Sequence, residues 1–299
     1  MTSEPESADE EAVGVDPLTA PLTYPGLPPW QPAVLVTDAE VLTLQPVRDS
    51  PLGQWIVRPG SKSPGSETTS RPESTREGRT GSAAGATSGS DGRRPDRSLD
   101  SLLLEGGGPS AAARTPVLAV GSNASPAQVR RKMANAGLPT QVPITAVTVR
   151  GLAVGVSAHV SRPGYLPATP VPDPAAESEL WVLWLDNVAL AAVDATEPNY
   201  HRVRLSARYP VRLTSGQVVA GAWVYVSRQG HLLNAVGQPR RLTDQATLIT
   251  ALLAELPELQ ALAGTDPEQW IKRTRDPAVR DAIRGQFRSK GLMRPVDEL

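Results

Sequence analysis

Glu197 is the acidic residue whose position in the sequence most suggests chemistry. In the segment 187–196, Leu190 and Val193 recur at helical spacing, and Glu197 falls on the same face. Acidic side chains are seldom directed to the apolar side of a helix unless they have a role or a partner there. A carboxyl group in such a place is a candidate general acid or base. Pairing with Arg202 is the structural alternative, and the pattern leaves both open.

A second group of residues that could do chemistry is a short loop of small side chains. This loop is formed by Gly121, Ser122 and Asn123. The apolar run 116–120 before it is typical of a buried strand, and a Ser-x-x-Gln capping box at 125–128 predicts a helix to about residue 137. Small residues let the backbone approach a ligand, and a helix start offers N–H groups to a carboxylate or phosphate. An ordinary strand-to-helix turn is the other interpretation.

The composition excludes several kinds of site and partner. Cys is absent, and the three His residues lie far apart without ligand spacing, so we expect neither a metal nor another cofactor. The formal net charge of -1 gives no field that would attract nucleic acid. No apolar run approaches the roughly 20 residues that span a bilayer, and the acidic N-terminus lacks a signal-peptide pattern. We therefore expect a cytoplasmic protein without a membrane partner.

The chain divides into five segments by composition. We expect a disordered acidic N-terminus at 1–23, a short β segment docking on the main domain at 24–58, a disordered linker at 59–98, the main domain at 114–230 and a helical extension at 231–299. The linker is predicted because residues 59–98 contain no Val, Ile, Leu, Met, Phe, Tyr or Trp. A triple-glycine run follows at 106–108 and lacks the Lys of a phosphate-binding loop, so it is interpreted as a hinge.

Within the main domain, strands are expected at 144–149, 152–160, 180–185, 203–213 and 218–226, with a long Pro-rich loop at 161–176. In the extension, helices are expected from 243, 267 and 277, where Asp or Thr caps precede the first turn. Val279, Ile283 and Phe287 form a core-facing stripe on the last of these. The pattern indicates the α+β class, with a compact or barrel-like sheet.

The order of these pieces resembles the γ-glutamylcyclotransferase-like family over residues 114–228. Three pieces match. Residues 118–123 are similar to the family's Tyr-Gly-Ser-Asn loop, and residues 179–185 are similar to the strand before its acidic helix. Residues 193–203 are similar to its Leu-Asp-x-x-Glu-Gly…Tyr-x-Arg-Val segment. The closing strand matches at 221–226. The chain departs from the family pattern at Val120, where an aromatic residue is usual, at Ala124 for Leu and at Pro198 for Gly.

The resemblance implies a small closed mixed β-barrel with short helices and a pocket at the Gly-Ser-Asn loop. Members of the family cyclise γ-glutamyl compounds to 5-oxoproline and release an amine. By this resemblance Glu197 is the general acid and base, and the substrate is held by Val120, Gly121, Ser122, Asn123, Tyr200 and Arg202. No cofactor is implied, and the oligomeric state stays open. Two alternatives remain: a non-catalytic binding or regulatory module on the same fold, and a hydrolase with Ser122 as nucleophile.

Overall fold

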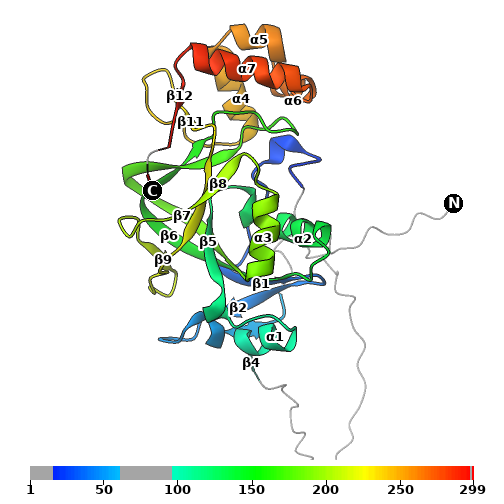
Figure 1. Cartoon of the computed structure of the whole chain (residues 1–299), viewed down its shortest axis with the longest axis vertical. Coiled ribbons are helices and arrows are strands. Elements are labelled where there is room, and N and C mark those ends of the chain that lie inside the picture. The colour runs from blue at the N-terminus through cyan, green and yellow to red at the C-terminus, as the bar shows by residue number, and fades with distance from the viewer. Residues whose placement is uncertain (1–15, 61–95, 297) are drawn as a thin grey trace, which may run out of the picture.

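The computed structural model describes residues 16–60, 96–296 and 298–299. In these ranges the chain forms a 10-stranded sheet, a small two-stranded sheet and seven α-helices (Figure 1), which confirms the α+β class. The large sheet occupies the middle of the molecule, and the C-terminal helices gather at one end of it (Figure 1). In the described part of the chain, no helix has both the length and the apolar character needed to cross a bilayer.

The large sheet follows an open path. Its strands are β1 (Ala33–Thr37), β2 (Val41–Gln45), β3 (Ile56–Arg58), β4 (Arg97–Ser98), β5 (Thr115–Ala119), β6 (Gln141–Val156), β7 (Ala168–Leu185), β8 (Tyr200–Arg204), β9 (Val211–Leu213) and β10 (Trp223–Ser227). Their order is β4-β3-β2-β1-β6-β7-β5-β10-β8, with β9 paired to β6 off this path. Only β5 and β10 are parallel among the described strand pairs. The closed barrel implied by the family resemblance is therefore wrong, because β4 and β8, the two end strands of the path, do not pair with each other.

The remaining elements lie on and around this sheet. The α-helices are α1 (Leu99–Glu105), α2 (Pro126–Asn135), α3 (Asn187–Ala195), α4 (Gln245–Glu255), α5 (Glu258–Ala263), α6 (Pro267–Arg273) and α7 (Pro277–Ser289). Short 3-10 helices are η1 (Pro21–Thr23), η2 (Leu52–Gln54), η3 (Ala111–Ala113) and η4 (Ser122–Ala124). Strands β11 (His231–Leu232) and β12 (Met293–Arg294) pair with each other.

Both faces of the sheet are lined by buried apolar side chains. Along β1, Val34 and Val36 pack into one hydrophobic cluster, whereas Leu35 packs into another. Helices α2 and α3 cover the first of these faces with Met133 and Val193, which are buried. Burial of one such side chain stabilises the fold by about 1.5–3 kcal/mol. The short edge strand β4, with two residues, limits pairing with other chains.

The N-terminal segment is part of the same structure. Strand β1 pairs with β6 along its whole length, from Ala33 opposite Thr145 to Thr37 opposite Gln141. Residues 16–23, expected to be disordered, instead form turns and η1, because Leu22 packs against the C-terminal helices. Residues 96–98, expected to belong to the linker, include strand β4. The rest of those two predicted segments, 1–15 and 61–95, lies outside the described residues, and the division into domains stays a prediction.

Two of the C-terminal helices, α6 and α7, begin where the sequence predicts. Asp266 and Asp276 cap helices α6 and α7 through their side chains, and Pro opens the first turn of each. Ile283 and Phe287 of α7 are fully buried, together with Trp270 of α6. The cap of α4 is Asp244 rather than the expected Thr243, and α5 was not expected.

Several expectations about the main sheet are wrong. The expected strands 144–149 and 152–160 belong to one strand, β6, which ends at Val156, and β10 begins at Trp223 rather than at 218. The segment 161–176 is not one long loop, because β7 already begins at Ala168. Here β7 pairs with β6, from Leu152 opposite Pro172 to Val156 opposite Ala168, whereas its pairing with β5 is confined to residues 181–185. The prolines in this part of β7 are tolerated because their nitrogens, which have no N–H to donate, can face the side of the strand that does not pair with β5. The expected strand 203–213 is divided between β8 and β9.

Candidate functional site

The loop between β5 and α2 contains η4 and leads directly into the helix. Pro126 opens α2, as the sequence predicts. The predicted capping box does not form, because the Ser125 side chain makes no capping hydrogen bond. Gln128 instead donates a hydrogen bond to Asp16 and accepts one from Arg131. The segment before the sheet thus lies against the start of α2.

Glu197 follows helix α3, directly after its C-cap residue Thr196. Its side chain is 16% exposed, and Oε1 accepts hydrogen bonds from Lys132 Nζ at 2.6 Å and from Asn123 Nδ2 at 3.1 Å. Lys132 Nζ also donates to Asn123 Oδ1 at 2.6 Å. The negative end of a helix dipole disfavours a carboxylate at this place, so the ammonium of Lys132 supplies the compensating charge. We name these three residues the Glu197 cluster.

Lys132 was not predicted as a site residue, although its position on the buried face of α2 could have indicated it. Gln128, Val129, Lys132 and Met133 are all buried on one face of the helix. A lysine on that face needs an anionic partner, because a buried unpaired ammonium is costly. Spacing along the chain could not identify that partner, since Glu197 lies 65 residues further on.

Arg202 does not join the Glu197 cluster. Its Nε and Nη2 donate to the two carboxylate oxygens of Asp194 at 3.0 and 3.1 Å, and its guanidinium lies 4.6 Å from the ring centroid of Trp223. Tyr225 donates to the same carboxylate at 2.7 Å. The alternative in which Arg202 pairs with Glu197 is therefore wrong, because Asp194 takes both of the hydrogen bonds that would make that pair.

Three tyrosines form an aromatic wall beside the Glu197 cluster. The rings of Tyr24 and Tyr165 stack with centroids 4.1 Å apart. Tyr24 Oη accepts a hydrogen bond from the Ala168 N–H at 2.9 Å, and Tyr200 donates to the Ala168 carbonyl at 2.8 Å. Burial raises the pKa of Tyr165 to about 12 and raises the pKa of Tyr24 and Tyr200, so all three hydroxyls stay protonated at neutral pH. Neither Tyr24 nor Tyr165 was singled out in the sequence.

Glu197, Lys132 and the aromatic wall line part of a cavity of ≈300 Å³. Three basic side chains, of Arg131, Lys132 and Arg162, contribute to its lining. This cationic lining favours a ligand that carries a carboxylate or another anionic group. The volume is at the lower end of the range that holds small molecules.

The predicted site residues are divided by the structure. Ser122, Glu197 and Tyr200 line the cavity, and Asn123 reaches it through its bond to Glu197. Gly121 lies behind the aromatic wall, where a Cβ atom would come within 2.4 Å of the Tyr24 hydroxyl oxygen. Val120 packs against the hydrophobic cluster that contains Leu35 and Leu118, away from the cavity.

His159 also lines the cavity, but it is engaged with a buried serine. Its Nδ1 lies 2.7 Å from Ser157 Oγ, which donates to Ser227 Oγ at 2.6 Å. Burial lowers the pKa of His159 to about 4, so the imidazole is neutral at physiological pH. Ser157 has no exposed surface and cannot meet a substrate. Among the described residues no hydrogen bond joins His159 to Ser122, so the arrangement does not support Ser122 as an activated nucleophile.

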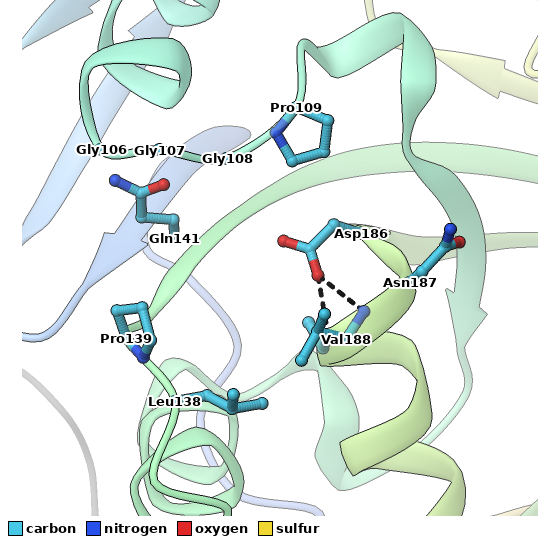
Figure 2. A pocket seen from close by; sticks show the side chains of 11 residues that line it. Gly106, Gly107, Gly108, Pro109, Leu138, Pro139, Gln141, Asp186, Asn187 and Val188 are labelled. Atoms are coloured by element: carbon cyan, nitrogen blue, oxygen red, sulfur yellow. Dashed lines mark hydrogen bonds between the residues drawn. The ribbon is translucent and has the colours of Figure 1, made fainter.

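A second hollow, of ≈390 Å³, lies at the opposite end of α3 (Figure 2). It is bounded by the triple-glycine run at 106–108, by Leu138 and Pro139 and by the first residues of the helix. Asp186 caps this helix end, accepting hydrogen bonds from the N–H groups of Val188 at 3.1 Å and Ala189 at 2.8 Å (Figure 2). Its carboxylate therefore has a structural role. Among the described residues, no group of three His, Asp or Glu side chains is placed to hold a metal ion.

Comparisons with known proteins give limited likenesses. No protein-family model matches the chain, and no curated protein matches it. A solved structure of a gamma-glutamyl cyclotransferase is 13% identical, with a TM-score of 0.24, over 27% of this chain and 50% of that chain. The solution structure of an Arabidopsis thaliana protein is 16% identical, with a TM-score of 0.31, over 50% of this chain and 89% of that chain. What the protein does must therefore be argued from the site itself.

Proposed function

We propose that the protein cyclises a small γ-glutamyl compound to 5-oxoproline and releases an amine, with Glu197 as the proton shuttle. The observation that carries this proposal is the carboxylate of Glu197. It faces a small cavity beside the Gly-Ser-Asn loop and is held there by Lys132 and Asn123. The motif resemblance in the sequence suggests the reaction, and the geometry of the cavity is compatible with it.

The chemistry needs no nucleophile from the protein. Glu197 takes a proton from the substrate's α-ammonium group, and the resulting amine attacks the γ-carbonyl carbon. The carbonyl electron pair moves to oxygen as the new C–N bond forms. When this pair returns, the original amide C–N bond breaks, and the departing amine receives the proton from Glu197. The ring nitrogen then loses a second proton to Glu197, which passes it to the released amine or to solvent. This leaves 5-oxoproline, the amine and one proton, and Glu197 is again a carboxylate.

The cavity walls supply the positioning that an intramolecular reaction requires. In the proposal, Arg162 binds the substrate's α-carboxylate, because Arg131 already faces Asp16 with its Nε 3.1 Å from a carboxylate oxygen. Ser122 and Tyr200 contact the glutamyl chain. Holding the α-amine against the γ-carbonyl in this way accounts for a large part of the expected rate. A cytoplasmic location would suit such a substrate and stays a prediction.

A binding module without catalysis is the second candidate, and one observation favours it. Glu197 Oε1 already accepts hydrogen bonds from both Lys132 and Asn123, as a purely structural ion pair would. In that case the cavity binds an anionic small molecule, and Glu197 only fixes the loop against α3. The two candidates differ in whether turnover depends on the charge of Glu197.

The deciding experiment measures 5-oxoproline by mass spectrometry after incubation with a panel of γ-glutamyl amino acids and γ-glutamyl amines. Glu197→Gln keeps the shape of the side chain but cannot accept the proton, so we expect turnover to fall by about 10²–10⁴-fold. Glu258→Gln is the matched control, because Glu258 also pairs with a lysine, Lys290, but on the surface of the C-terminal helices. The control should turn over like the wild type.

Each outcome separates the candidates. Loss of turnover in folded Glu197→Gln, with the Glu258→Gln control intact, supports catalysis. Wild-type turnover in Glu197→Gln would exclude Glu197 as the shuttle. If the wild type forms no 5-oxoproline from any compound of the panel, the cyclase proposal fails and the binding module is favoured.

A further inference from the structure

Tyr24 comes from the segment before the large sheet, yet it forms part of the cavity wall. It is 5% exposed, and its ring stacks on Tyr165. Its hydroxyl reaches the backbone of the Gly-Ser-Asn loop, where only a glycine at position 121 leaves room, because a Cβ atom there would lie 2.4 Å from the hydroxyl oxygen. A residue far from the loop in sequence is thus built into the site.

The hydrogen bonds around this hydroxyl have a defined direction. Tyr24 Oη accepts from the Ala168 N–H at 2.9 Å. Tyr200 has the opposite polarity, because it donates its hydrogen to the Ala168 carbonyl at 2.8 Å. The bond from Ala168 uses a lone pair of Tyr24 and leaves its hydrogen available for donation. Burial raises the pKa of Tyr24, so the hydroxyl keeps that hydrogen at neutral pH.

We propose that Tyr24 is a catalytic residue whose hydroxyl donates a hydrogen bond to the γ-carbonyl oxygen of the substrate, an inference that rests on the proposed function. The negative charge that develops on this oxygen during attack is stabilised by the hydroxyl, and no proton is transferred from Tyr24. The backbone N–H group of Ala168 polarises the hydroxyl, as a preorganised oxyanion site requires.

Two features favour Tyr24 as a hydrogen-bond donor to the substrate over Tyr24 as a residue that blocks the cavity. The cavity of ≈300 Å³ exists with Tyr24 in place as one of its walls. The tyrosine is also fixed from both sides, by Tyr165 on its ring and by Ala168 on its hydroxyl, which suits a group that must not move during the reaction. Asp16 of the same segment contacts Arg131 and Gln128, which holds the segment against α2.

The test is Tyr24→Phe, which keeps the stacked ring and removes only the hydroxyl. We expect kcat for 5-oxoproline formation to fall by about 10²–10³-fold, with KM changed less than about threefold, because the donor acts on charge that develops in the transition state. Tyr225→Phe is the matched control, since it removes a buried hydroxyl that bonds to Asp194, outside the cavity lining. Its kcat should match the wild type.

A second variant covers the case in which Tyr24→Phe does not fold. Gly121→Ala places a methyl group against the Tyr24 hydroxyl, and we expect it to lower kcat in the same way. An active wild type together with an unchanged kcat in Tyr24→Phe, or in Gly121→Ala if the first variant is insoluble, would overturn the inference and leave the proposed function intact. An inactive wild type would overturn both. A rise in kcat in Tyr24→Phe would show that Tyr24 obstructs the site, which also overturns the inference.

Discussion

Helix α3 has a carboxylate and a hollow at each of its ends, and the two ends differ in what holds the charge. At the N-terminal end, Asp186 accepts hydrogen bonds from two backbone N–H groups of the helix. The positive end of the dipole favours this carboxylate, and the guanidinium of Arg114 lies 3.6 Å from its other oxygen. At the C-terminal end, Glu197 faces the unfavourable end of the dipole and depends on Lys132.

The two hollows also differ in size. The hollow beside Asp186 is the larger, at ≈390 Å³ against ≈300 Å³ for the cavity beside Glu197. A carboxylate whose hydrogen bonds complete a helix end is part of the scaffold. A carboxylate that is kept at an unfavourable place by a buried lysine is a stronger candidate for function.

The largest expected effect follows from removing the cation at the cavity end. Lys132→Met leaves the largely buried carboxylate of Glu197 without a cation beside it. We expect the free energy of unfolding to fall by about 3–4 kcal/mol, near the lower end for breaking a buried pair because Glu197 keeps 16% exposure. Urea titration followed by circular dichroism measures the change.

The double variant Lys132→Met/Glu197→Gln is the control for this prediction. With the charge of Glu197 also removed, part of the lost stability should return, giving a coupling free energy of about 1 kcal/mol or more. A single variant within about 0.5 kcal/mol of the wild type would mean that the two ends of α3 do not differ in the way described.

The pH dependence of stability sharpens the comparison at the same end. The folded protein holds the pKa of His159 at about 4 through burial, with a smaller effect of Arg284. In the unfolded chain the pKa is about 6.5, so between these values the unfolded chain binds the proton more strongly. The contribution of His159 is complete above about pH 6.5 and is lost progressively as the pH falls to about 4.

Unfolding free energies of wild type and His159→Gln at several pH values measure this effect. From pH 7 to 4 the wild type should lose roughly 3 kcal/mol more than the variant. Parallel curves for the two proteins would show that His159 is not buried in its neutral form.

A smaller effect is expected at the other end of the helix. Asp186→Ala removes the N-cap of α3 and the ion-pair partner of Arg114, whose Nη1 still donates to the Gln141 and Trp184 carbonyls. We expect it to cost about 1–2 kcal/mol of stability, whereas Asp186→Asn keeps a capping side chain and should cost less. Neither variant should change the rate of 5-oxoproline formation. A loss of turnover in folded Asp186→Asn would show that this end also takes part in function.

The smallest effect is expected from filling the larger hollow. Val188 is 61% exposed beside it, and Val188→Trp would occupy part of the space. We expect kcat/KM and the melting temperature to stay close to the wild type, since no step proposed here uses this hollow. A raised KM in this variant would indicate that substrate binds in the hollow at the N-terminal end of α3.

Much of the local structure could be predicted from the sequence because local chemistry specifies it. The strand before Gly121, the helix opened by Pro126 and the Asp-Pro starts of α6 and α7 follow from apolar runs and capping residues within a few positions of each other. The extent of β7 could not be predicted, because Pro residues are tolerated there only as a result of how β6 pairs with it.

The sequence by itself determined that Glu197 follows an apolar helix face and precedes Pro198. Only the tertiary structure decided its partner, because Lys132 and Glu197 are 65 positions apart and meet where α2 packs beside α3. The same holds for Tyr24, whose hydroxyl meets Ala168 across 144 positions. Hydrophobic periodicity and capping act within a few residues, whereas the charge and hydrogen bonds of a site depend on which faces the core brings together.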